Sequence, residues 1–259
     1  MEKNKKLNVR GKIMENYDGY NYEKFRELAK NTSLSMYEKI GAPDHYRANT
    51  EELIFNDILT KCPLLIKRDL NVLDIGTGCT QLPKFIINLC EKQNHRLFLA
   101  DSPEMLDLNE DKSFIKKIPG FFPDTAEEIR KISGGIDVII CYSVLHYAFV
   151  DTNVWEFIDS MMELLNDGGQ AIIGDIPNIS KRKRFFASNN GKKFHQIFMN
   201  TTETPNVKFN CIEKCKIDDS LLLSIIMRCH FFGFDAYIVP QASGLTFANR
   251  RDDIIIRKP

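Results

Sequence analysis

Hydrophobic positions follow two different rhythms along the chain. Up to about residue 65 they recur at helical spacing, as in segments 22–28 and 52–59. Beyond Pro63, short apolar runs alternate with amphipathic stretches, which is typical of strands separated by helices in a parallel sheet. The predicted strands are 71–75, 96–100, 114–118, 136–141 and 170–175, and the predicted helices between them are 80–90, 124–131 and 151–165.

The last third of the chain departs from this alternation. Residues 176–216 are polar and are predicted to be irregular, and a helix then begins at Asp218 or Ser220 and ends at Gly233. The chain finishes in two strand-like runs close enough to pair as an antiparallel hairpin, 234–239 and 252–257. The sequence therefore predicts an α/β fold with a seven-stranded, mostly parallel sheet, a terminal antiparallel hairpin and helices on both faces.

The change of rhythm also predicts a domain organisation. Residues 1–65 are expected to form an N-terminal helical cap or lid, and residues 66–259 the α/β domain. Within that domain, 176–216 are expected to be an insertion on the substrate side. The polar composition of this insertion and its place after the fifth strand put it where ligands bind in open α/β sheets.

Charge and hydropathy limit the possible partners. The chain has 35 basic and 35 acidic residues, so it lacks the broad positive footprint of many nucleic-acid enzymes. No apolar run approaches the roughly 20 residues that span a bilayer. The first twelve residues are basic but are not followed by an apolar stretch, so they do not resemble a secretory signal. We expect a cytoplasmic protein that acts on a small molecule, with no membrane partner and with nucleic acid disfavoured.

Seven scattered cysteines agree with a reducing compartment, because several lie inside apolar segments. A zinc site could be assembled on paper from a late group of ligands: Cys211, Cys215, Cys229 and His230. No CxxC pair is present, and the spacing does not match common zinc sites. We therefore predict no metal site.

The most informative stretch runs from Asp74 to Gly78. An apolar strand enters a turn that carries Gly76 and Gly78, and a helix follows. Glycines let the backbone approach a ligand closely, and the helix start offers free N–H groups. A dinucleotide site would use the same device, but its third glycine position is Gln81 here. Together with the acidic Asp74, this departure favours a zwitterionic methionine moiety over a diphosphate.

The stretch Asp74-Ile75-Gly76-Thr77-Gly78 resembles the first motif of the class I S-adenosylmethionine-dependent methyltransferases. Asp101 ends the second strand 27 residues after Asp74, and the segments 137–147 and 164–173 resemble later motifs of that family. The resemblance implies a Rossmann-like fold, S-adenosylmethionine as cofactor, and Asp101 as the ligand of the ribose hydroxyls. The expected cofactor-binding residues are Asp74, Gly76, Thr77, Gly78, Gln81, Asp101, Ser102, Met105, Phe121, Phe122, Tyr142 and Ser143. Phe121 and Phe122 either wall the adenine or belong to the core.

Candidate catalytic residues follow the fourth and fifth strands. His146 lies just beyond the fourth strand and is either a general base or a structural residue that lines the cofactor pocket. Asp175, at the end of the fifth strand, either takes a proton or positions a ligand. A sugar hydroxyl would need such a base, whereas a phosphate-type oxygen or a carboxylate arrives already ionised.

Basic and aromatic side chains are the candidates for acceptor binding. The run from Lys181 to Arg184 is either a solvated surface or a grip for an anionic acceptor. The expected acceptor-binding residues are Tyr46, Arg47, Lys181, Arg184, His195 and Arg250.

Three late segments, 174–188, 243–245 and 249–251, resemble bacterial methyltransferases associated with surface polysaccharides. This resemblance implies O-methylation of a small polar or anionic metabolite in capsule or surface polysaccharide biosynthesis, with a sugar, nucleotide-linked or phosphoramidate-type acceptor. Two alternatives remain. One is an RNA methyltransferase, which only the basic run 181–184 supports, and the other is a non-catalytic protein that binds S-adenosylmethionine.

Overall fold

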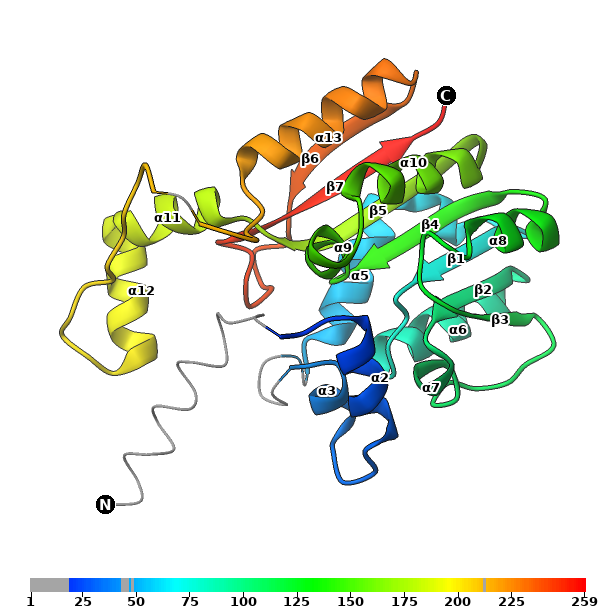
Figure 1. The fold of residues 1–259 in the computed structure, drawn as a ribbon, viewed down its shortest axis with the longest axis horizontal. Helices are drawn as coiled ribbons and strands as arrows, with labels where there is room; N and C mark the ends of the chain where they lie inside the picture. Colours follow the sequence, from blue (N-terminus) through cyan, green and yellow to red (C-terminus); the bar gives the residue numbers. More distant parts are fainter. Residues whose placement is uncertain (1–18, 43–46, 48, 212) are drawn as a thin grey trace.

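A seven-stranded sheet forms the centre of the molecule (Figure 1). The computed structural model describes residues 19–42, 47, 49–211 and 213–259. The strand order is β3-β2-β1-β4-β5-β7-β6, and β7 alone runs opposite to the other six strands. The strands are β1 (Asn71–Ile75), β2 (Arg96–Asp101), β3 (Ile115–Pro119), β4 (Ile136–Tyr142), β5 (Leu165–Pro177), β6 (Asp235–Pro240) and β7 (Arg251–Arg257). The predicted fold class is confirmed.

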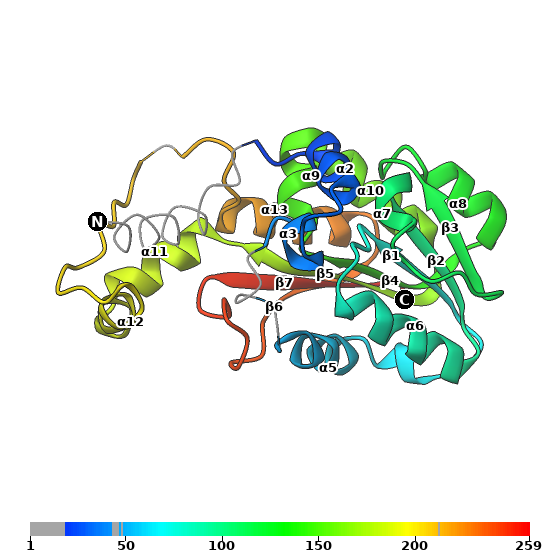
Figure 2. The ribbon, with the colours of Figure 1, turned by 90° about the horizontal axis from the view of Figure 1, so that it is seen from below.

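Alternation along the strands builds two apolar layers, one on each face of the sheet. Val72 of β1 is buried with residues of α5 (Glu51–Lys61) and α6 (Gln81–Gln93), whereas its neighbour Leu73 is buried with those of α8 (Ala126–Ser133), α10 (Val154–Leu164) and α13 (Asp219–Phe231). Figure 2 shows α5 and α6 on one side of the sheet, with α8, α10 and α13 on the other. Both faces of the central strands are therefore buried, as expected for a parallel sheet.

The N-terminal region divides between one of the two apolar layers and the carboxyl edge of the sheet. α2 (Tyr22–Lys30) and α3 (Met36–Lys39) lie near the carboxyl ends of the parallel strands (Figure 1). α5 and the short 3₁₀ helix Pro63–Ile66 instead contribute buried residues, among them Ile58 and Leu65, to the core beneath the sheet. The predicted domain boundary at residue 65 stays a prediction. Residues 51–66, most of which fall on the cap side of that boundary, pack against the sheet.

The predicted irregularity of 176–216 is wrong, because two helices form there: α11 (Ile179–Ala187) and α12 (Asn189–Met199). They extend away from the sheet beyond the end of β5 (Figure 1). Their apolar side chains pack on one another, with the rings of Phe185 and Phe194 5.6 Å apart, and so leave no stripe directed at the main core.

Helix ends explain two further boundaries. Asp218, one of the two predicted caps, accepts a hydrogen bond from the Leu221 N–H at the start of α13, and Gly233 follows the helix with a φ of 83°. The predicted helix 151–165 begins instead at Val154, because Asn153 caps it. A separate helix, α9 (Leu145–Asp151), precedes it and places residues 145–147 beside the carboxyl end of β4. In the described part of the chain, no helix has both the length and the apolar character needed to cross a bilayer.

Candidate active site

The turn after β1 is shaped by two glycines in the left-handed region. Gly76 and Gly78 have φ values of 69° and 68°, and the Gly76 N–H donates to the Ala100 carbonyl at 2.8 Å. A Cβ on Gly76 would lie 2.4 Å from Cγ2 of Val144, so both the backbone angle and the packing require glycine. The turn therefore brings bare backbone to the rim of a cavity.

Two buried carboxyl groups lie beside this turn. Asp101 accepts hydrogen bonds from the N–H groups of Gly78 and Ser102, at 2.9 and 2.6 Å. Burial raises its pKa to about 6, although these hydrogen bonds oppose the shift. Burial, and then the nearby Asp101, raises the pKa of Asp74 to about 7. No described cation is among the groups that shift either pKa, so a positively charged ligand would favour ionisation of both.

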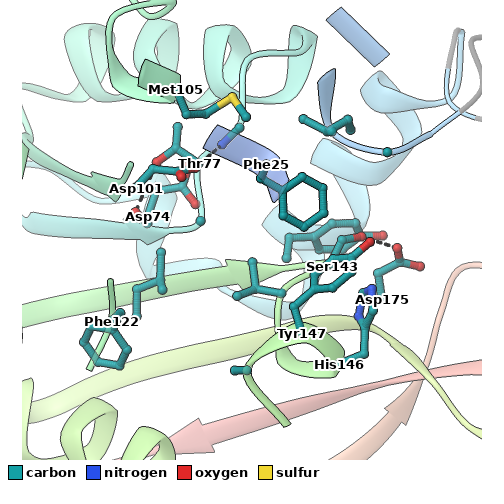
Figure 3. Close-up of a pocket in the computed structure, with 18 of the residues that line it drawn as sticks. Phe25, Asp74, Thr77, Asp101, Met105, Phe122, Ser143, His146, Tyr147 and Asp175 are labelled. Carbon is teal, nitrogen blue, oxygen red and sulfur yellow. Dashed lines mark hydrogen bonds between the residues drawn. The ribbon is translucent and has the colours of Figure 1, made fainter. Parts of the chain in front are cut away.

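The cavity itself, which we call the first cavity, opens at the carboxyl ends of β1, β2, β4 and β5. Figure 3 shows Asp74, Thr77, Asp101 and Met105 grouped at one end and Ser143, His146 and Asp175 at the other. Ten of the twelve expected cofactor-binding residues line it: Asp74, Gly76, Thr77, Gly78, Asp101, Met105, Phe121, Phe122, Tyr142 and Ser143.

The other two expected cofactor residues have structural roles beside the cavity. Ser102 caps the short helix α7 (Pro103–Leu106) by accepting from the Met105 N–H at 3.2 Å. The Gln81 N–H donates to the buried carboxylate of Glu51 at 2.8 Å, and Thr80 donates to the same group. Glu51 of α5 thus holds the start of α6, the helix that follows the glycine turn.

Helix α2 covers part of the first cavity and was missed as a site element. Tyr22 and Phe25, one helical turn apart, both line the cavity. Arg26 anchors the helix through two hydrogen bonds of 2.9 Å to Glu104 in α7. Phe25 also packs edge-on against Tyr147, with centroids 4.8 Å apart. The i, i+3 spacing of the two aromatic residues was the available sequence signal.

At the far end of the cavity, two strained residues meet on adjacent strands. Ser143 and Asp175 have φ values of 62° and 61°, and the Ser143 hydroxyl donates to the Asp175 carboxylate. The register between β5 and β7 shifts between Ile173 and Ile176, which is the signature of a β-bulge. The bulge brings the Asp175 side chain to the cavity wall, and such local strain is often found at functional sites.

Asp175 is clamped between two arginines. Arg47 lies 3.1 Å from its carboxylate, and Arg251, at the start of β7, forms a second ion pair with the same oxygen. Burial opposes ionisation of Asp175, but Arg251 and Arg47 outweigh it, so its pKa lies below the usual range. The carboxylate is therefore ionised and engaged at neutral pH, which makes it a weak candidate for proton removal and a strong one for positioning.

A second buried carboxylate, that of Asp253, holds the backbone of the bulge by a hydrogen bond. Asp253 accepts the Asp175 N–H at 2.8 Å and pairs with Lys61 of α5 at 2.6 Å. The side-chain amide of Gln241 lies 3.3 Å from the Asp175 carboxylate and 3.2 Å from that of Asp253. These contacts fix the backbone at the point where the two arginines converge.

His146 lies in the cavity wall between Asp175 and Tyr147 (Figure 3). Burial lowers its pKa to about 3, and the positive charge of Arg251 adds to this effect. The imidazole is therefore neutral over the physiological pH range. Its role as a general base stays a prediction, but a base with so low a pKa removes a proton from a hydroxyl poorly.

The remaining candidates for acceptor binding are scattered. Arg47 lines the first cavity, Arg250 lines a different one, and Tyr46 lies outside the described residues. The other three candidates line neither cavity. Lys181 bonds to the Arg251 carbonyl and Asp252, Arg184 pairs with Asp219, and His195 packs against Phe186.

Arg251 belongs to the segment 249–252 that the sequence places near the acceptor, but the prediction chose only Arg250 from it. It stands next to the chosen Arg250, but strand alternation places 251 on the same face as Asp253, toward α5 and the bulge. That alternation was the signal that could have separated the two arginines. Within the described residues, no group of three or more His, Cys, Asp or Glu side chains is placed to hold a metal ion.

Comparison with known proteins adds information on the fold. No protein-family model matches the sequence, and no curated protein matches it. Among solved structures, the N-methyltransferase NodS from Bradyrhizobium japonicum WM9, in complex with S-adenosylhomocysteine, is 14% identical with a TM-score of 0.53. The similarity covers 92% of this chain and 98% of that one. The plantazolicin methyltransferase BpumL, also in complex with S-adenosylhomocysteine, is 13% identical with a TM-score of 0.54 over 97% of this chain and 99% of that one.

A third similar structure is the fibrillarin pre-rRNA processing protein of Methanococcus jannaschii. It is 15% identical, with a TM-score of 0.50 over 81% of this chain and 76% of that one. At these identities the similarity establishes a shared fold. The chain's Rossmann-like sheet with its terminal antiparallel hairpin is therefore a fold similar to that of NodS and BpumL.

Proposed function

We propose that this protein is an S-adenosylmethionine-dependent methyltransferase that methylates an oxygen of a small anionic metabolite. The observation that carries the proposal is the first cavity, where two buried carboxyls without a described cation face the glycine turn. S-adenosylmethionine bears an ammonium and a sulfonium charge and supplies an electrophilic methyl group. Asp74 and Asp101 would favour such a cation, and the bare backbone of Gly76 and Gly78 would admit it closely.

The structures of NodS and BpumL support this choice of ligand, because both are complexes with S-adenosylhomocysteine, the demethylated product. Asp101 would accept the two ribose hydroxyls. Each carboxylate oxygen has two acceptor sites, so the bonds from Gly78 and Ser102 leave capacity for both hydroxyls. Met105, Phe121 and Phe122 would provide an apolar wall for the adenine.

The opposite end of the cavity supports an acceptor that arrives ionised. Arg47 and Arg251 together carry two positive charges against the single negative charge of Asp175. His146 is neutral and only weakly basic there. A carboxylate or phosphate-type oxygen needs no proton removed, and positioning near the donor supplies most of the catalysis that such a displacement requires. The role in capsule or surface polysaccharide biosynthesis, with a sugar, nucleotide-linked or phosphoramidate-type acceptor, remains part of this proposal.

Calorimetry tests the cofactor step first. Titration of the purified protein with S-adenosylmethionine and S-adenosylhomocysteine should give saturable binding of both. Methyl transfer from radiolabelled cofactor to a panel of phosphorylated metabolites and sugar nucleotides then tests the acceptor class. Absence of cofactor binding would overturn the whole proposal, whereas labelling of RNA alone would overturn the small-molecule acceptor. Cofactor binding with no transfer to any class would indicate a non-catalytic binding protein.

A further inference from the structure

A second cavity adjoins the first on the side of α9 and α11. It lies between these two helices, the start of β7 and the segment that leads into α13. Figure 1 shows where these elements lie. Four residues line both cavities and so form a common wall, namely His146, Tyr147, Phe247 and Arg251. A molecule in the second cavity therefore reaches the acceptor end of the first cavity across a single layer of side chains.

Positive charge dominates the lining of the second cavity. Arg182, Lys216 and Arg250 join Arg251 there, against the single carboxylate of Glu213. Glu213 is itself paired with Lys183 at 2.5 Å, so its charge is largely offset by a residue outside the lining. The positive charge of this lining also acts on the common wall. Arg251 and Lys216 lower the pKa of His146, as does Arg47 from the first cavity.

The guanidinium groups in this cavity are held by aromatic rings. The Arg250 guanidinium carbon lies 4.6 Å from the centroid of the Phe247 ring, and the Arg251 guanidinium carbon lies 4.7 Å from the same centroid. Arg182 lies 5.1 Å above Phe186. Stacking uses the face of a guanidinium, whereas its N–H donors lie in the plane and match the oxygens of a phosphate. Stacked arginines are therefore oriented before a ligand arrives.

We propose that the second cavity binds a phosphate-type group of the methyl acceptor, held by Arg182, Lys216 and Arg250, while the atom to be methylated faces the first cavity. This inference rests on the proposed function and narrows it. The acceptor is a small organic phosphate that also carries the ionised oxygen to be methylated, and the two anionic groups lie apart. Tyr147 and Phe247, in the common wall, contact the part of the molecule between the two. The helix pair α11–α12 thus serves acceptor recognition through Arg182 and the rings that orient Arg250.

Calorimetry with inorganic pyrophosphate tests the subsite directly. The protein is first saturated with S-adenosylhomocysteine and then titrated with pyrophosphate at constant ionic strength. We expect saturable binding to the natural protein and at least about tenfold weaker binding to the double variant Arg182→Gln/Lys216→Gln, because two charge-assisted contacts are removed. The control Lys67→Gln/Arg68→Gln removes the same charge from exposed positions that line neither cavity and should change the affinity less than twofold. Succinate should bind at least tenfold more weakly than pyrophosphate.

The two proposals fail in different ways. Loss of S-adenosylhomocysteine binding in the natural protein contradicts the proposed function, whatever pyrophosphate does. If S-adenosylhomocysteine binds normally, three results would contradict the phosphate subsite and leave the proposed function intact. They are no binding of pyrophosphate, unchanged pyrophosphate affinity in the double variant, and succinate binding as tight as that of pyrophosphate. The affinity of each variant for S-adenosylhomocysteine also reports its folding. If the double variant loses that affinity, Lys216→Gln alone replaces it, with the same expected direction.

Discussion

The two ends of the first cavity are built in opposite ways. The end at β1 and β2 is assembled from local sequence: a glycine turn, the two carboxyl groups that flank it, and backbone N–H groups. No described cation is among the groups that shift the pKa values of these carboxyls. The end at β4, β5 and β7 draws Arg47, Ser143, Asp175 and Arg251 from four distant segments, joined by ion pairs. One end offers negative charge and bare backbone, and the other offers net positive charge.

This contrast has a physical basis in what each end is proposed to bind. A shared cofactor has fixed chemistry, so a compact local motif suffices to hold it. An acceptor differs from enzyme to enzyme, and its ligands come from loops and strand ends that a rigid sheet brings together. Perturbing each end separately should therefore affect different measurements.

The largest effect is expected at the glycine turn. Gly76→Ala combines an unfavourable left-handed backbone with a Cβ 2.4 Å from Val144, and should weaken S-adenosylhomocysteine binding by 100-fold or more, about 2.7 kcal/mol. Calorimetry measures this loss. Gly134→Ala is the matched control, because Gly134 has a φ of 79° but no atom within 4 Å of the added Cβ. Equal effects of the two changes would mean that the turn is not a ligand site.

The two arginines that pair with Asp175, Arg47 and Arg251, should affect the free energy of unfolding. Arg251→Gln leaves the buried Asp175 with one cation, and we expect a loss of about 2 kcal/mol in the free energy of unfolding. Adding Asp175→Asn should restore part of that loss, because the uncompensated charge disappears. Urea denaturation of the single and double variants measures both terms. Arg184→Gln, which breaks an exposed pair with Asp219, should cost less than about 0.5 kcal/mol.

A change at Asp101 should affect cofactor binding and leave the acceptor side unchanged. Asp101→Asn keeps one acceptor oxygen but loses the charge, and should weaken S-adenosylhomocysteine binding by about 10- to 30-fold. Its effect on pyrophosphate binding should be within twofold, since Asp101 lines only the first cavity. The control Asp167→Asn changes an exposed carboxylate remote from both cavities. If Asp101→Asn weakened S-adenosylhomocysteine and pyrophosphate binding by similar factors, the two ends would not be separate binding sites.

The same contrast explains how much of the site the sequence could predict. Local rules found the β1 end, because Gly76, Gly78 and Asp101 stand at strand ends with fixed spacing, and all three line the first cavity. The acceptor end depends on which side chains the fold brings together over 128 residues, the separation between Arg47 and Asp175. The bulge at Asp175 follows from the tertiary register of β5 against β7. The helices α11 and α12 were not predicted, and their aromatic residues pack on one another.

Titration of Asp74 gives a smaller effect with a definite sign. Its folded pKa of about 7 lies above the unfolded value near 3.8, so the folded state holds the proton more tightly and stability falls as pH rises from about 4 to 7. Asp74→Asn removes this loss. The variant should therefore gain about 1 kcal/mol or more in stability relative to the natural protein between pH 5 and pH 8, at about 1.4 kcal/mol per pKa unit. Thermal unfolding without ligand measures it, and a gain that shrinks as pH rises would contradict the raised pKa.

The smallest effect is expected at His146, where the chemistry of the acceptor is decided. A general base contributes about 100-fold or more when a hydroxyl must lose its proton, but an imidazole with a pKa of about 3 is already neutral and weakly basic. If the acceptor oxygen arrives ionised, His146→Asn should lower kcat less than about threefold and leave the pH profile of kcat flat between pH 6 and 8. Steady-state kinetics with the acceptor found in the panel measures both. A 100-fold loss with an altered pH profile would instead identify a hydroxyl acceptor whose proton His146 removes. That result would contradict the ionised acceptor oxygen of the proposed function, and the cations of the second cavity would then only bind the separate phosphate group of the acceptor.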